Sequence, residues 1–182
     1  IFWRRIDVEG LERLELSGEP DRIIANSTVV CVGAGGFRLD HRWRLDSDWR
    51  AQSVDVEVWN SQGHRTLSLQ RVAEGWCVDG CLRPDLDGAD DPDLSVTPFC
   101  NTFPIRRVPR SAGDSLTIDT VFIDAPALTV ARSRQRYVRL GPNLLRYCDL
   151  GVHDGFEANL LVDDSGLVVH YDHLFEQLKP ST

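Results

Sequence analysis

The residue types best suited to binding a charged ligand are concentrated between Arg83 and Arg107. This stretch reads RPDLDGADDPDLSVTPFCNTFPIRR, with four prolines, five aspartates and an arginine pair at its end. Arg106 and Arg107 suit bidentate contact with a phosphate or carboxylate head group, because a guanidinium presents parallel N–H donors. They equally suit pairing with Asp91 and Asp93, and we favour this structural interpretation because the acidic partners lie in the same segment.

Aromatic side chains supply a second kind of candidate binding group. The aromatic residues that could line the rim of a ligand cavity are Trp43, Trp59, Tyr137 and Tyr147, with Asn101 as a further polar contact. Such rings are apolar in the body and polar at one end, and the C–H face of a sugar packs on them as other apolar surface does. The alternative is that each ring only fills the core, and for any one residue taken alone this alternative is favoured.

An enzyme is the competing class of function. Possible bases are His41, His64, His153, His170 and His173. No serine elbow, HExxH, GxGxxG or Walker motif accompanies them, so we assign no catalytic residue and expect no cofactor. His41 falls on the apolar face of its strand, as a core histidine would, and His170 and His173 are too few for a metal site.

The five cysteines are odd in number and scattered: Cys31, Cys77, Cys81, Cys100 and Cys148. The CxxxC spacing of Cys77 and Cys81 matches neither the CxxC redox motif nor a zinc knuckle. We therefore expect reduced, mostly buried thiols, no disulfide and no metal.

Composition narrows the class of partner. At 182 residues, 42% hydrophobic and 26% charged, the chain suits one domain over residues 1–182 with an ordinary core. A net charge of −8 disfavours nucleic acid and adsorption to anionic membranes through charge alone. Lys179 is the only lysine among 20 basic residues, and codon usage in a GC-rich genome is the favoured explanation.

The sequence gives no sign of a membrane span or leader. No apolar run approaches the roughly 20 residues that cross a bilayer. The chain starts Ile-Phe-Trp-Arg-Arg, with no apolar stretch behind the charges, so a cytoplasmic location is expected. Because the first residue is not methionine, a trimmed leader and a periplasmic location stay open.

Period-two alternation predicts the elements that position these residues. Residues 37–45 alternate apolar or aromatic side chains with charged ones, as a half-buried strand does. Further strands are expected at 52–59, 64–72, 76–82, 115–124, 128–140, 144–147, 156–162 and 167–171. One short helix is expected at Asp172–Leu178, ended by Pro180. Many short strands with turns between them indicate an all-β antiparallel sandwich or barrel.

The segment from Asp91 to Arg107 behaves unlike a strand or an ordinary turn. Pro92, Pro98 and Pro104 each remove a backbone donor, so the segment is excluded from a central strand. Its polar residues are types that bond locally to backbone. We therefore expect one ordered, Ω-like loop held by ion pairs among Asp91, Asp93, Arg106 and Arg107, bordering the ligand cavity.

This segment also carries a family resemblance. Asp91-Pro92-Asp93-Leu94, Thr97-Pro98-Phe99-Cys100-Asn101-Thr102 and Pro104-Ile105-Arg106-Arg107 match every fixed position of the signature of the putative glycolipid-binding family. The opening Trp3-Arg4-Arg5-x-Asp7-x-x-Gly10-x-Glu12 and the stretch Gln135-x-Tyr137-x-Arg139-Leu140 are similar to it as well. One departure is Ala51-Gln52, where the family has a Thr-Arg pair.

The resemblance implies both a fold and a function. The bacterial family has an antiparallel β-fold, a strongly curved sheet or incompletely closed barrel, likened in shape to periplasmic lipoprotein carriers. An apolar concave face would then bind an amphipathic ligand, a glycolipid or related lipid. The alternatives are an enzyme acting on a small or lipid-like substrate, and an interaction module that recruits a partner at an open sheet edge.

Overall fold

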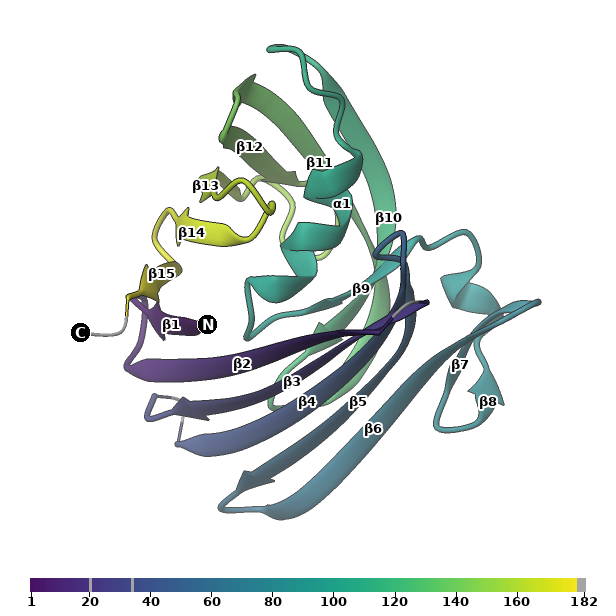
Figure 1. Ribbon diagram of the computed structural model, residues 1–182. Helices are drawn as coiled ribbons and strands as arrows, with labels where there is room; N and C mark the ends of the chain where they lie inside the picture. The colour runs from purple at the N-terminus through teal and green to yellow at the C-terminus, as the bar shows by residue number, and fades with distance from the viewer. Residues whose placement is uncertain (20, 34, 180–182) are drawn as a thin grey trace.

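The computed structural model describes residues 1–19, 21–33 and 35–179 (Figure 1). Over these residues the chain forms 15 strands and few helical turns. The strands are β1 (Phe2–Arg5), β2 (Gly10–Glu19), β3 (Arg22–Cys31), β4 (Phe37–Asp46), β5 (Ala51–Asn60), β6 (Gly63–Val72), β7 (Gly75–Val78), β8 (Cys81–Leu82), β9 (Asp91–Leu94), β10 (Ser115–Asp124), β11 (Thr129–Gly141), β12 (Leu144–Asp149), β13 (Glu157–Val162), β14 (Val168–Tyr171) and β15 (Phe175–Leu178). The helix α1 (Thr102–Arg107) follows a 3₁₀ turn at Phe99–Asn101, and a second 3₁₀ turn spans Pro84–Leu86.

All the described strands belong to one curled sheet. Its order is β8-β7-β6-β5-β4-β3-β2-β1-β15-β14-β13-β12-β11-β10-β9, so β1 pairs with β15 and joins two meanders. Neighbouring strands run antiparallel except β9, which runs parallel to β10. The sheet does not close, because β8 and β9 are its two edges. The expected all-β, incompletely closed barrel is confirmed.

Two expectations about individual elements are corrected. The helix predicted at Asp172–Leu178 is wrong: Phe175–Leu178 is strand β15, whose backbone pairs with both β1 and β14. Without it β1 would lack its second neighbour, so pairing outweighs a weak helical pattern. The three strands β1, β2 and β3, over residues 2–31, were not anticipated.

The concave face of the sheet is filled by the chain itself. We call residues 95–108 the plug; it includes α1, which lies inside the curl (Figure 1). Every plug residue from Val96 to Ile105 is buried. Phe103 packs with the core of the β1–β6 half, and Ile105 packs with the core of the β10–β15 half. The plug therefore joins two apolar clusters into one interior.

Local chemistry explains why the plug is helical rather than extended. Pro98 and Asn101 lie in the right-handed helical region, and Pro104 falls in the first turn of α1, where its missing N–H is not needed. The helix ends after one and a half turns, where Val108 returns to extended backbone. Pro92 sits in β9, an edge strand, which is where a sheet tolerates proline.

The opening between the two sheet edges is bridged by side chains instead of a strand ladder. Arg65 on β6 donates to the carbonyls of Pro126 (2.7 Å) and Ala127 (3.2 Å) in the turn after β10. Arg71, also on β6, donates across the opening to the carbonyl of Asp90, just before β9, and on its own side to the carbonyl of Ala51 on β5 (3.0 Å). Each guanidinium thus satisfies two backbone acceptors, which a lysine ammonium on a single flexible stem does less well.

Trp76 on β7 adds a third contact across the opening, and we call the contacts of Arg65, Arg71 and Trp76 the seam. Its Nε1 donates to the carbonyl of Ala89 at 2.9 Å, while the Arg71 guanidinium lies over its ring, 4.3 Å from the centroid.

Among the described residues, no helix is long and apolar enough to cross a bilayer.

The seam predicts an unequal effect of two identical substitutions. Arg71→Lys should lower the free energy of unfolding by about 1.5–3 kcal/mol, because it breaks hydrogen bonds from a charged donor to half-buried carbonyls. Arg44→Lys, on the exposed face of β4, should change it by less than about 0.5 kcal/mol. Urea unfolding followed by tryptophan fluorescence measures both, and equal stability of the two variants would contradict a role for the fork of donors.

Candidate functional site

A cavity of about 230 Å³ remains between the plug and the second half of the sheet. Its apolar wall comes from strands β10, β12, β14 and β15 and the loops between them. Its polar wall comes from β9, the start of the plug and the end of β12. The lining residues are Asp93, Leu94, Ser95, Thr97, Asn101, Phe122, Tyr147, Asp149, His153, Phe156, Tyr171, Leu174 and Phe175.

Three aromatic rings form the apolar wall. Tyr147 on β12, Phe156 in the loop before β13 and Tyr171 on β14 have centroids 6.0–6.4 Å apart in every pair. Phe175 on β15 continues the row, 6.1 Å from Tyr171. The strand residues point inward because they alternate with outward-facing neighbours. Burial raises the pKa of the Tyr147 and Tyr171 hydroxyls, so both stay neutral.

Asp93 anchors the polar wall. Its carboxylate accepts hydrogen bonds from Gln135 Nε2 and from Cys100 Sγ, the latter at 3.0 Å. Asn101 Nδ2 donates to the Tyr137 hydroxyl (2.9 Å), which donates to Gln135 Oε1 (3.0 Å). Each residue of this hydrogen-bond chain therefore donates to the next, from Asn101 through Tyr137 and Gln135, and the last acceptor is the Asp93 carboxylate. Burial raises the pKa of Asp93, although the bonds from Cys100 and Gln135 oppose that shift.

A second carboxylate, Asp149, stands at the end of β12. Its Oδ2 accepts from the Tyr147 hydroxyl at 3.0 Å, and its Oδ1 accepts from the backbone amides of Gly151 (2.8 Å) and His153 (3.2 Å). The His153 ring is 59% exposed, with Nδ1 3.8 Å from Asp149 Oδ2 and its edge on Phe122. Asp149 thus holds the loop that carries His153 over the cavity.

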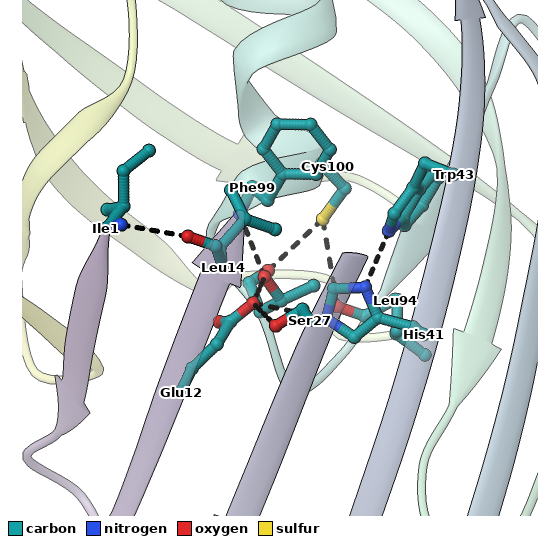
Figure 2. A network of polar contacts seen from close by, with 10 residues as sticks. Ile1, Glu12, Leu14, Ser27, His41, Trp43, Leu94, Phe99 and Cys100 are labelled. Atoms are coloured by element: carbon teal, nitrogen blue, oxygen red, sulfur yellow. Dashed lines mark hydrogen bonds and ion pairs between the residues drawn. The ribbon is translucent and has the colours of Figure 1, made fainter. Parts of the chain in front are cut away.

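A buried network fixes the plug against the first half of the sheet (Figure 2). Glu12 Oε1 on β2 accepts from Ser27 Oγ (2.7 Å), Thr97 Oγ1 (2.8 Å) and His41 Nε2 (3.1 Å). Trp43 Nε1 donates to His41 Nδ1 at 2.8 Å, which assigns the ring proton of neutral His41 to Nε2. A carboxylate with three donors thereby positions Thr97, the residue that begins the turn into the 3₁₀ segment.

The candidate aromatic residues occupy three different environments. Trp43 is fully buried, with its ring 5.9 Å from Phe99 and 5.3 Å from Phe103 of the plug. Trp59 lies on the convex face, stacked on His64 and covered by the Arg38 guanidinium. Tyr137 is buried in the hydrogen-bond chain below the cavity, while Tyr147 and Asn101 line the cavity itself.

The four charged residues expected in an ion-paired loop separate into different contacts. Arg107 pairs with Asp91, which is almost fully buried and whose pKa burial raises despite the pairing. Arg106 instead donates to the Ser165 carbonyl and lies over the Trp49 ring, 4.3 Å from its centroid. Asp93 contacts Cys100 and Gln135 rather than an arginine.

Sequence reasoning missed most of the cavity wall. Phe156, Tyr171 and Phe175 were assigned to elements without a role, and Asp149 was not singled out. The alternation of Tyr147 and Asp149 at the end of one strand is the signal that could have found the polar side of the cavity.

Among the described residues, no group of three or more His, Cys, Asp or Glu could hold a metal ion, and all five cysteines are free thiols.

The raised pKa of Asp93 predicts a pH-dependent penalty on stability. The folded protein binds this proton more tightly than the unfolded chain, in which an aspartate titrates near about 3.9. The neutral acid therefore favours folding at low pH, and that contribution is lost as the pH rises towards the raised pKa. Asp93→Asn, which is uncharged throughout, should gain stability relative to the native protein between about pH 4 and neutrality.

Urea unfolding at a series of pH values measures this difference. Asp154→Asn removes an exposed carboxylate from the loop after β12 and serves as the matched control, with a profile parallel to that of the native protein. A stability difference for Asp93→Asn that stays constant with pH would show that the carboxyl is not strained by burial.

Comparison with known proteins agrees with this architecture. The family described as "Putative glycolipid-binding" matches residues 1–177. The crystal structure of a DUF1089 family protein from Pseudomonas aeruginosa is similar, with 37% sequence identity, a TM-score of 0.80 and 92% of each chain covered. Among curated proteins no match to this chain is found. Since the family match spans nearly the whole chain, the protein belongs to the family described as putative glycolipid-binding.

Proposed function

We propose that the protein binds an amphipathic ligand, a glycolipid or related lipid, with one end of the ligand in the cavity beside the plug. The observation that carries this proposal is the division of the cavity into an aromatic wall and a wall of polar side chains. Ligand sites in proteins have this composition: mostly apolar surface with a few polar groups that fix orientation. The family description points the same way.

The size of the cavity limits what it holds. Sites for drug-sized ligands enclose roughly 300–1,000 Å³, and this one encloses about 230 Å³. It therefore takes a single sugar ring, a small head group or the end of an acyl chain, and the rest of a glycolipid would extend outside. Each methylene that is buried adds about 0.8 kcal/mol to binding.

The seven candidate residues named from the sequence divide accordingly. Tyr147 and Asn101 are proposed to contact the ligand directly. Tyr137 is proposed to act through Asn101, to which it is hydrogen-bonded. Trp43, Trp59, Arg106 and Arg107 are proposed to support the fold, because their partners are other side chains and backbone carbonyls.

Hydrolysis of a bound ligand is the second candidate, favoured by the His153–Asp149 pair beside the cavity. The 3.8 Å between His153 Nδ1 and Asp149 Oδ2 exceeds hydrogen-bond distance, and Asp149 already accepts three other bonds. A general base needs an orienting partner. The geometry therefore supports binding better than catalysis, and recovery of unchanged ligand after prolonged incubation tests the choice.

Filling the cavity should weaken binding without unfolding the protein. Leu174, partly buried in the cavity wall, is the site for Leu174→Trp, and the exposed Leu161 on β13 allows Leu161→Trp as the matched control. Titration with octyl glucoside below its micelle concentration, followed by calorimetry, measures affinity. We expect about tenfold or greater weakening for Leu174→Trp, equivalent to about 1.4 kcal/mol, and native affinity for Leu161→Trp.

Urea unfolding of both variants establishes that each is folded. Undiminished glucoside binding by a folded Leu174→Trp variant would place the ligand elsewhere. No binding by the native protein, together with no lipid in a mass spectrum of the purified protein, would remove the proposed function.

A further inference from the structure

The charged side chains that line the cavity are acidic. Asp93 and Asp149 both line it, and the described lining residues include no arginine and no lysine, although the chain carries 20 basic residues. His153 is the one lining group that can become cationic, and its ring is largely in solvent. The two carboxylates repel each other, and Asp149 contributes to the raised pKa of Asp93.

The arginines around the plug and the cavity wall are engaged elsewhere. Arg5, which lies over the ring of the lining residue Phe175, is paired with Asp7. Arg107 is paired with Asp91. Arg139 donates to the carbonyls of Ile105, Val108, Pro109 and Pro142. Arg106 is held by Trp49 and the Ser165 carbonyl. These guanidiniums are held by other groups and none of them is among the residues that line the cavity, so we look outside the chain for a cationic partner of its carboxylates.

The opposite wall favours the same kind of partner. Tyr147, Phe156 and Tyr171 present three rings at mutual distances of 6.0–6.4 Å and at angles of 45–62° to one another. The face of an aromatic ring is electrostatically negative, and clusters of such faces bind quaternary ammonium groups. Desolvation inside a cavity strengthens this attraction relative to that at an exposed surface.

We propose that the cavity selects ligands whose polar group is a cationic amine or quaternary ammonium group. The cation lies between the three rings and the carboxylates of Asp93 and Asp149. This inference rests on the proposed function and names the head-group class of the same site. Phosphate, sulfate and carboxylate groups are repelled there, while a neutral sugar can hydrogen-bond to the carboxylates but gains no attraction between charges.

Choline and 3,3-dimethylbutan-1-ol provide a direct test, because they share one shape and differ in charge. Calorimetric titration of the native protein at fixed ionic strength should give one site, with choline bound about tenfold more tightly than its neutral isostere. In Asp93→Asn and in Asp149→Asn the preference for choline should fall towards equality. In Asp154→Asn, which removes an exposed charge outside the cavity, it should be unchanged.

The outcomes separate this inference from the proposed function. Equal affinity for choline and its isostere, or a preference for choline that survives in Asp93→Asn and Asp149→Asn, overturns the cationic head group. Because Asp149 also holds a loop, Asp93→Asn decides the matter if Asp149→Asn fails to fold. Octyl glucoside binding without choline binding overturns this inference and leaves the proposed function, whereas the absence of both removes the two together.

Discussion

A single curled sheet has one apolar concave face and no second layer to cover it, and this constraint shapes the whole molecule. Sandwiches meet the same need with a second sheet, and closed barrels meet it with side chains. Here the covering layer is the plug, buried without interruption from Val96 to Ile105. Because Phe103 packs in one core cluster and Ile105 in the other, both halves of the sheet depend on the same short segment. The cavity is the space that the plug leaves unfilled.

The motifs that resemble the family signature meet around the plug. Glu12 near the start of the chain binds Thr97, and Gln135 and Tyr137 connect Asn101 to Asp93. Irregular backbone inside a protein needs such partners, because each buried polar group without one is destabilising. The signature therefore has a structural reason to exist, independent of any ligand. The residues that it also supplies to the cavity wall, Asp93 and Asn101, are positioned by the same bonds.

The sequence was sufficient for most strands and insufficient for the site. Period-two alternation identified strands such as β4 and β5, since it reflects the inward and outward faces directly. It did not distinguish Trp43 from Tyr147: both point inward, and only the path of the plug decides that one is covered and the other borders a cavity. Trp59 illustrates a second gap: alternation places it on the face opposite Val58, but local patterning does not reveal that Arg38 and His64 cover its ring there. The long-range contacts that close the site are not encoded in local patterning.

The pairing of β1 with β15 has a consequence for how the protein is made. Trp3 Nε1 donates to the carbonyl of Val168, 165 positions along the chain, and β1 has β15 as one of its two neighbours. During synthesis the first strand therefore leaves the ribosome long before its second partner exists. Contacts of such large sequence separation slow folding, because the loop entropy must be lost before they form. The edge of β1 stays unpaired in the meantime, and exposed strand edges of this kind make incomplete chains prone to aggregation.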